Sequence, residues 1–253
     1  MNSDNRIYMG IDLTSQRNSL TCAAIDASRK LLFCDTVTPL DWENLLNTYQ
    51  DVLLGVNSPL TLNLGYMADE EYRGQLSNPP SKSRYTDLRV CEYQLICQGI
   101  PPSRTPKNVS KFSPALQRAY KFASELGMKG FQFWPFPNSR YQMFEINADA
   151  AYWSLLDVKP FTASSLEGRI QRQLCLQTNS VAVKDPMSFF EEITRHRLLS
   201  GKLPDEMILA PTALNALVGA LTAWVVANRP AEYKRFGEAD EGVIYLPLNP
   251  KKF

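Results

Sequence analysis

The first 57 residues constrain the fold most, because short apolar segments alternate there with tight turns. Residues 7–13 (IYMGIDL), 19–26 (SLTCAAID) and 30–37 (KLLFCDTV) are joined by the turn-like SQRN and ASRK, which predicts three antiparallel strands. Residues 39–49 have apolar side chains at helical spacing, and residues 51–57 (DVLLGVN) form a continuous apolar run typical of a strand buried on both faces. This pattern predicts a mixed α/β sheet with a crossover helix before its fourth strand.

The rest of the chain is expected to add helices and further strands around this sheet. The stretches are a loop at 58–87, helices at about 87–98 and 114–127, a strand at about 141–146, helices over much of 163–203, and an edge strand at 241–248. We find no internal repeat and no domain boundary. The prediction is therefore a single domain, residues 1–253, with helical insertions around 58–140 and 163–205.

Composition narrows the class of protein. Apolar residues make up 44% and charged residues 21%, with a net charge of +1, so bulk charge favours no particular partner. Five scattered cysteines without a CxxC motif, together with the single histidine His196, argue against a zinc site and for a reducing, cytoplasmic setting. The N-terminus lacks an apolar signal core, and the longest apolar run, 213–227, is too short and too polar for a membrane span.

Four polar residues stand at predicted strand or helix ends. Asp12 ends the first strand, Asn57 ends the fourth, and Glu145 lies near the end of the fifth. Asn215 falls in the first turn of a helix for which Thr212 is the predicted N-cap. The ends of central strands in a mixed sheet converge on one edge, so we expect these residues to share one site. Four acidic side chains there would suit phosphoryl transfer by two Mg²⁺ ions.

Several longer stretches resemble those of a known family. They are GIDLTS (10–15), GVNSPLTLN (55–63), LRVCEYQL (88–95), FEINADAAYWSLL (144–156), LEGRIQRQLCL (166–176), TALNALVGALTAW (212–224) and EGVIYLP (241–247). In this order they resemble an uncharacterised bacterial and archaeal family of predicted nucleases, a domain of unknown function. The resemblance implies a ribonuclease H-like mixed sheet of about five to six strands flanked by helices. It also implies hydrolysis of phosphodiester bonds in nucleic acid with Mg²⁺ or Mn²⁺, held by Asp12 and Glu145.

The chain departs from the family pattern at two catalytic positions. Family members typically carry aspartate where Asn57 and Asn215 stand. An asparagine can offer one neutral oxygen but cannot neutralise a cation, so two carboxylates leave about half the charge of two Mg²⁺ ions uncompensated. We therefore expect weak metal binding and impaired hydrolysis. The sequence leaves open whether the amides are natural or were introduced.

Each of these residues also has a purely structural interpretation. Asp12 can bond nearby amides, and Glu145 can form a salt bridge. Asn57, which precedes Ser58-Pro59, is a natural turn-former, and Asn215 can return a hydrogen bond to the predicted N-cap.

Three arginines are candidate contacts for DNA or RNA. Arg169 and Arg172 lie three residues apart on one predicted helical face, and Arg89 follows the polar loop that borders the site. A further basic segment, 107–122, has aromatic residues interleaved, a pattern that suits phosphate contact and base stacking. The alternatives are solvated helix faces and, for Arg89, a pair with Glu92 at i+3.

Three functions are consistent with these patterns. The first is the metal-dependent nuclease scaffold, with impaired activity. The second is a catalytically inactive subunit, a pseudoenzyme that binds nucleic acid or another protein. The third is an actin-like ATPase, suggested by GIDLTSQRNSLTCAAID, although no second glycine-rich phosphate motif is present. The oligomeric state is not determined by the sequence, and a homodimer is compatible with it.

Overall fold

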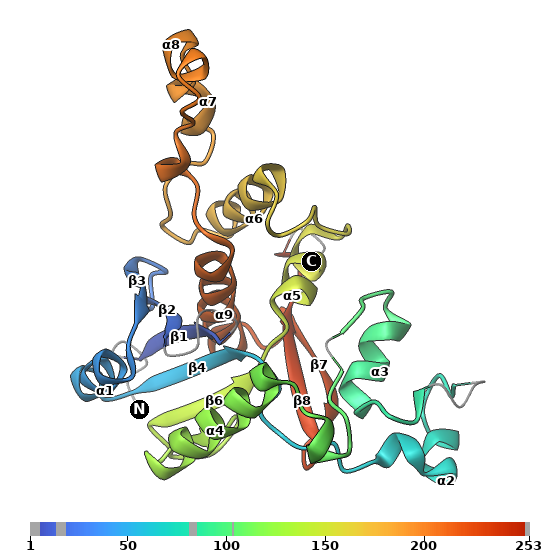
Figure 1. The fold of residues 1–253 in the computed structure, drawn as a ribbon. Coiled ribbons are helices and arrows are strands. Elements are labelled where there is room, and N and C mark those ends of the chain that lie inside the picture. The colour runs from blue at the N-terminus through green and yellow to red at the C-terminus, as the bar shows by residue number, and fades with distance from the viewer. Residues whose placement is uncertain (1–5, 14–18, 81–84, 103, 251–253) are drawn as a thin grey trace.

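The computed structural model describes residues 6–13, 19–80, 85–102 and 104–250, and it has an α/β fold (Figure 1). Within these residues, one mixed sheet of eight strands is flanked by helices. The predicted α/β class is confirmed, but the predicted number of five to six strands is too low.

The strands follow the predicted sequence of an antiparallel meander and then crossover strands. They are β1 (Ile7–Asp12), β2 (Leu20–Ile25), β3 (Leu31–Val37), β4 (Val52–Asn57), β5 (Gln132–Phe133), β6 (Tyr141–Glu145), β7 (Tyr233–Glu238) and β8 (Gly242–Pro247). Their order is β3-β2-β1-β4-β6-β8-β7, and β5 pairs with β6 off this path. β1, β4, β6 and β8 are parallel, whereas β2, β3 and β7 run antiparallel to their neighbours.

The sequence analysis did not predict two of the strands, β5 and β7, and it placed β8 wrongly at the edge of the sheet. β5 has only two residues, and β7 (YKRFGE) is polar because it lies at the edge of the sheet, so neither shows an apolar strand pattern. The stretch predicted as an edge strand, 241–248, corresponds to β8. β8 instead lies inside the sheet, between β6 and β7.

Most helices lie close to their predicted positions, but α2 (Glu70–Gly74) lies within the stretch 58–87 that was predicted to be a loop. The helices are α1 (Pro39–Thr48), α2 (Glu70–Gly74), α3 (Val90–Cys97), α4 (Pro114–Met128), α5 (Ala148–Leu156), α6 (Leu166–Thr178), α7 (Ser188–Glu192), α8 (Arg195–Leu199) and α9 (Pro211–Asn228). Short 3-10 turns occur at Tyr66–Ala68, Val109–Lys111 and Asp205–Met207. α7 and α8 extend away from the sheet (Figure 1).

The start of α9 differs from the sequence prediction. Thr212 is not the N-cap, because the helix begins at Pro211 and Ala210 occupies the cap position without a side-chain hydrogen bond. Proline is favoured at the first helical position, where its fixed φ suits the helix and its missing N–H would have no helical partner.

The central helix α9 packs directly against the backbone of the sheet. A Cβ atom on Gly10 of β1 would lie 1.9 Å from the carbonyl oxygen of Ala216, and one on Gly55 of β4 would lie 2.8 Å from that of Gly219. These glycines therefore allow an approach that no side chain permits. They fix the face of the sheet that α9 covers.

α9 is also the part of the chain that most resembles a membrane span. The run 213–227 was predicted to be too short and too polar for a membrane span, but this prediction is wrong on length and composition. Among the described residues, the helical stretch Asp205–Asn228, which contains the run, meets both criteria. However, 67% of its apolar window is buried within the fold. This burial is the behaviour of the core helix of a water-soluble protein.

We predict that Gly10→Ala destabilises the protein by about 3 kcal/mol or more, because the new methyl group meets backbone atoms that cannot rotate away. Gly127→Ala is the matched control: it lies in α4 with no atom within 4 Å of the added Cβ, and we expect a gain of about 0.5–1 kcal/mol. Urea unfolding measures both free energies. Equal effects of the two substitutions would contradict the proposed packing of α9.

Candidate functional site

A cavity of about 310 Å³ lies at the carboxyl ends of β4 and β6. Asn57, Glu145 and Asn215 line it, together with Arg89 and Arg104. The fourth predicted residue, Asp12, is fully buried and contacts two of the lining side chains. The predicted convergence of strand ends and the start of a late helix is thus present in the structure.

The register of the sheet divides the four residues into two groups. Asp12 pairs with Asn57 across β1 and β4, and both lie two residues beyond the glycines under α9, so their side chains face α9. Glu145 pairs with Val56, one residue earlier than Asn57, so its side chain points to the opposite face. Glu145 therefore reaches the cavity from the other side of the sheet edge.

Two amides bind the carboxylate of Asp12. Asn215 donates its Nδ2 hydrogen to Oδ2 of Asp12 over 2.9 Å, and Asn57 donates to Oδ1 over a longer 3.5 Å. The Oδ1 atom of Asn57 in turn accepts the backbone N–H of Ala148, 2.9 Å away at the start of α5. This second bond fixes the orientation of the Asn57 amide.

Asn215 does not form the local bond to a helix cap that we considered. Its amide turns instead toward Asp12, and its Oδ1 atom is buried without a hydrogen-bond partner among the described residues. A buried unpaired oxygen costs about 1–3 kcal/mol, so this orientation is favoured by the charge of Asp12 rather than by complete pairing.

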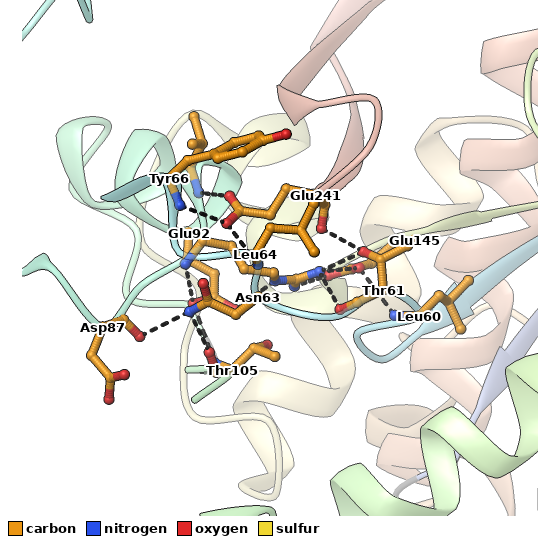
Figure 2. Close-up of polar contacts among 12 residues, drawn as sticks. Leu60, Thr61, Asn63, Leu64, Tyr66, Asp87, Glu92, Thr105, Glu145 and Glu241 are labelled. Atoms are coloured by element: carbon orange, nitrogen blue, oxygen red, sulfur yellow. Dashed lines mark hydrogen bonds and ion pairs between the residues drawn. The ribbon is translucent and has the colours of Figure 1, made fainter. Parts of the chain in front are cut away.

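The carboxylate of Glu145 is bound by Arg89. Nη2 of Arg89 lies 2.5 Å from Oε1, and Nη1 lies 2.8 Å from Oε2, which makes a two-pronged ion pair between buried side chains. The backbone N–H of Leu60 adds a third bond, 3.2 Å from Oε2. Figure 2 shows Glu145 and Leu60 at one end of this network.

Arg89 also binds a second acidic residue, Glu92, at its own helix start. Its Nε donates to Oε1 of Glu92 over 3.0 Å, and its backbone N–H donates to Oε2 over 3.2 Å. Oε2 also accepts the N–H of Thr105 (Figure 2). The ion pair between Arg89 and Glu92, which the sequence analysis gave as an alternative, is therefore confirmed. The side chain of Arg89, predicted as a nucleic-acid contact, is only 1% exposed and is committed to two carboxylates.

Burial and the ion pair act on the acidity of both partners. Burial raises the pKa of Glu145 above its usual value, although the charge and hydrogen bonds of Arg89 oppose this effect. Burial alone would lower the pKa of Arg89, but the charge of Glu145 raises it well above the ordinary value. The guanidinium group therefore remains charged at neutral pH.

A third buried acid, Glu241, completes the network. Its Oε1 accepts backbone N–H groups of the loop before α2, and its Oε2 accepts that of Val90 at the start of α3, 2.8 Å away. The loop donors are Leu64 at 3.1 Å, Gly65 at 3.1 Å and Tyr66 at 3.4 Å (Figure 2). Glu241 thereby ties the turn between β7 and β8 to the segment that carries Arg89.

The sequence analysis considered Glu92 only as an alternative partner of Arg89 and did not identify Glu241 at all. Glu92 stands three residues after the cap of α3, a position where glutamate commonly bonds the cap, so a signal existed. Glu241 gives no comparable signal, because its partners lie 151 to 177 residues away in the chain.

Arg169 and Arg172 have structural partners outside the cavity. Arg169 donates to the carbonyl oxygens of Leu209 and Ile208, 2.9 and 2.7 Å away. Arg172 is 2% exposed, and it donates to the carbonyl of Phe161 and to Oδ1 of Asp149 at 2.7 and 2.8 Å. Both arginines hold α6 to neighbouring segments, and neither lines the cavity.

The basic segment 107–122 divides into buried rings and exposed cations. Phe112 stacks on Tyr120 with ring centroids 5.0 Å apart, and Phe122 is buried against Trp42. Phe112 and Phe122 are buried, whereas Tyr120 is partly buried and its hydroxyl donates to the carbonyl oxygen of Thr61 over 2.7 Å. All three rings therefore pack within the protein. Nearby cations do remain exposed along the connection before α4, namely Arg104, Lys107 and Lys111, and Arg104 lines the cavity.

The side chains present do not fit a two-cation centre. Both oxygens of Asp12 accept amide hydrogens, and both oxygens of Glu145 bind Arg89, whose charge offsets that of Glu145. Two divalent cations carry four positive charges and need several free anionic oxygens. Across the part of the chain that is described, no three His, Cys, Asp or Glu side chains are grouped to hold a metal ion.

Comparisons with protein-family models, with curated proteins and with solved structures found no match to this chain. The resemblance to the predicted-nuclease family therefore stays a prediction that rests on the motifs.

We predict that Arg89→Met destabilises the protein by about 3–5 kcal/mol at neutral pH, because it leaves Glu145 and Glu92 buried without a cation. Loss of Arg89 raises the pKa of Glu145 further. As the pH falls through this raised pKa, Glu145 takes up a proton in the folded state but not yet in the unfolded state. Protonation therefore restores part of the lost stability at lower pH. Chemical unfolding from about pH 8 to about pH 5.5 should show the deficit narrowing.

Arg6→Met is the control for this substitution. Arg6 pairs with Asp51 at 2.7 Å, but the two side chains are 19% and 24% exposed, so we expect a loss of about 1 kcal/mol or less. If both variants lose the same stability at every pH, the buried pair does not have the role assigned to it.

Proposed function

We propose that this chain is a ribonuclease H-like scaffold whose metal-dependent nuclease centre is disabled, and that it binds nucleic acid without hydrolysing it. One observation carries the proposal. The two family-type carboxylates, Asp12 and Glu145, have their charges satisfied by protein groups, namely two amides and a guanidinium.

The topology supports the choice of scaffold. An antiparallel meander, β1 to β3, continues into parallel crossover strands β4 and β6, and the cavity lies at their carboxyl ends. This arrangement is what the family resemblance implies. Fold alone is a weak warrant for activity, so the functional argument rests on the side chains.

The side chains favour loss of hydrolysis over slow hydrolysis. A metal at Asp12 would have to displace amide hydrogens of Asn57 and Asn215, and one at Glu145 would have to displace Arg89 from a buried position. Each displacement breaks charge-assisted hydrogen bonds. Under this proposal Mg²⁺ or Mn²⁺ binds weakly, with Asn215 Oδ1 as one neutral oxygen available to it.

Exposed cations at the cavity rim support the binding role. Arg104 lines the cavity, and Lys107 and Lys111 follow it on the same connection; within the described residues, none of the three takes part in an ion pair. Cations without acidic partners attract phosphate groups and release counterions on binding. The five free cysteines are compatible with the proposed cytoplasmic location.

We predict that the protein binds single-stranded RNA or DNA in EDTA and leaves it intact when Mn²⁺ is added. The variant Arg104→Ala/Lys107→Ala/Lys111→Ala should bind more weakly, and its slope of log affinity against log salt should fall by about 2, because each lost phosphate contact removes somewhat less than one counterion for single strands. Fluorescence anisotropy with a labelled oligonucleotide measures affinity, and gel analysis of the same mixtures measures cleavage.

The control variant removes three exposed lysines from other surfaces, Lys159→Ala/Lys184→Ala/Lys202→Ala, and so changes the net charge equally. If both variants weaken binding to the same extent, the rim is not the binding surface. Mn²⁺-dependent cleavage that is abolished by Asp12→Ala would overturn the proposed loss of hydrolysis.

A further inference from the structure

A second cavity, of about 210 Å³, lies between β6 and β8. These strands are paired at a single register position, Glu145 with Ile244, while the preceding part of the same β6 edge pairs with β5. β8 therefore diverges from β5 and leaves a gap. Aromatic rings and a proline surround the gap, namely Phe133, Trp134, Pro135, Phe144 and Tyr245.

The inner walls of this cavity are fixed, and its mouth is open. Phe144 and Tyr245 are buried, with ring centroids 5.1 Å apart at 68°, and the Tyr245 hydroxyl donates to the carbonyl oxygen of Trp134 over 3.2 Å. Phe133, by contrast, exposes 46% of its surface. A cavity of this size and lining accepts one flat ring, which can stack on the exposed face of the lining.

The charges around the cavity favour a ligand with an anionic group. Arg235 of β7 lines it and is exposed, and it takes part in no ion pair among the described residues. Glu145 and Thr61 lie at its inner end, where the charge of Glu145 is already offset by Arg89. Arg235 is therefore the charged lining residue whose charge no ion pair among the described residues offsets.

We propose that this cavity binds the base of a nucleotide, with Arg235 contacting the phosphate. A nucleobase combines a flat π-face with hydrogen-bonding edges, and base stacking on aromatic side chains is tolerant of sequence. The cavity shares Glu145 with the first one, so the two cavities adjoin at the residue that pairs with Arg89. Recognition of a base within a polymer rests on the proposed function, whereas binding of a free nucleotide does not.

Isothermal titration of the full chain with AMP, GMP, CMP and UMP tests this site, with ribose 5-phosphate as the ligand that lacks a base. We expect the nucleotides to bind and ribose 5-phosphate not to bind. Phe133→Ala should weaken nucleotide binding about tenfold. Phe136→Ala is the matched control, because Phe136 is similarly exposed, at 49%, but does not line the cavity, and we expect it to leave affinity unchanged.

Adenosine, which lacks the phosphate group, should bind more weakly than AMP. Arg235→Gln should remove this difference, whereas Lys234→Gln, on the neighbouring residue, should keep it. Equal losses from Phe133→Ala and Phe136→Ala, or equal binding of AMP and ribose 5-phosphate, would overturn the proposal. If the protein binds nucleotides but not oligonucleotides, the result supports this cavity and refutes the proposed function. If it binds oligonucleotides but not free nucleotides, the result supports the proposed function and refutes this cavity.

Discussion

The structure around the site depends on one buried cation, the guanidinium group of Arg89. It joins Glu145 at the end of β6 to Glu92 in α3, with nitrogen–oxygen distances of 2.5 to 3.0 Å. Buried carboxylates are stable only when a cation or several hydrogen bonds compensate them. Because Glu241 adds backbone bonds to the same segment, the loop after β4, the start of α3 and the turn before β8 form one rigid unit around the cavity.

Asp12 follows the same principle on the other face of the sheet. The negative charge of its carboxylate is compensated by hydrogen bonds from the amide groups of Asn57 and Asn215 rather than by a cation. Under the proposed function, Asn57 and Asn215 stand where aspartates would supply oxygens to a cation, and their amide groups supply hydrogen-bond donors instead. The Oδ1 atom of Asn215 is buried and has no hydrogen-bond partner among the described residues. The proposed function follows from this chemistry, because hydrolysis by two metal ions requires more free negative charge than these side chains offer.

The sequence predicted the parts of this site that follow from periodicity and topology. Asp12, Asn57 and Glu145 were expected together with Asn215 because central strands end at one edge, where a helix start can pack. The structure places Asn57, Glu145 and Asn215 in the lining of one cavity, and Asp12 accepts hydrogen bonds from the two asparagines. The orientation of Glu145 was not predictable, since a shift of one residue in register moves a side chain to the other face. The burial of Arg89 depends on contacts with a residue 56 positions away, which no local pattern shows.

Calorimetric titration of Mn²⁺ into the wild-type protein and into Asn57→Asp/Asn215→Asp tests the central claim most directly. If the protein's own groups satisfy Asp12 and Glu145, the wild-type protein binds Mn²⁺ no more tightly than on the order of millimolar. The double variant should bind at least about tenfold more tightly, because it replaces two donors by carboxylates. Micromolar binding by the wild-type protein that disappears in Asp12→Ala would contradict the account.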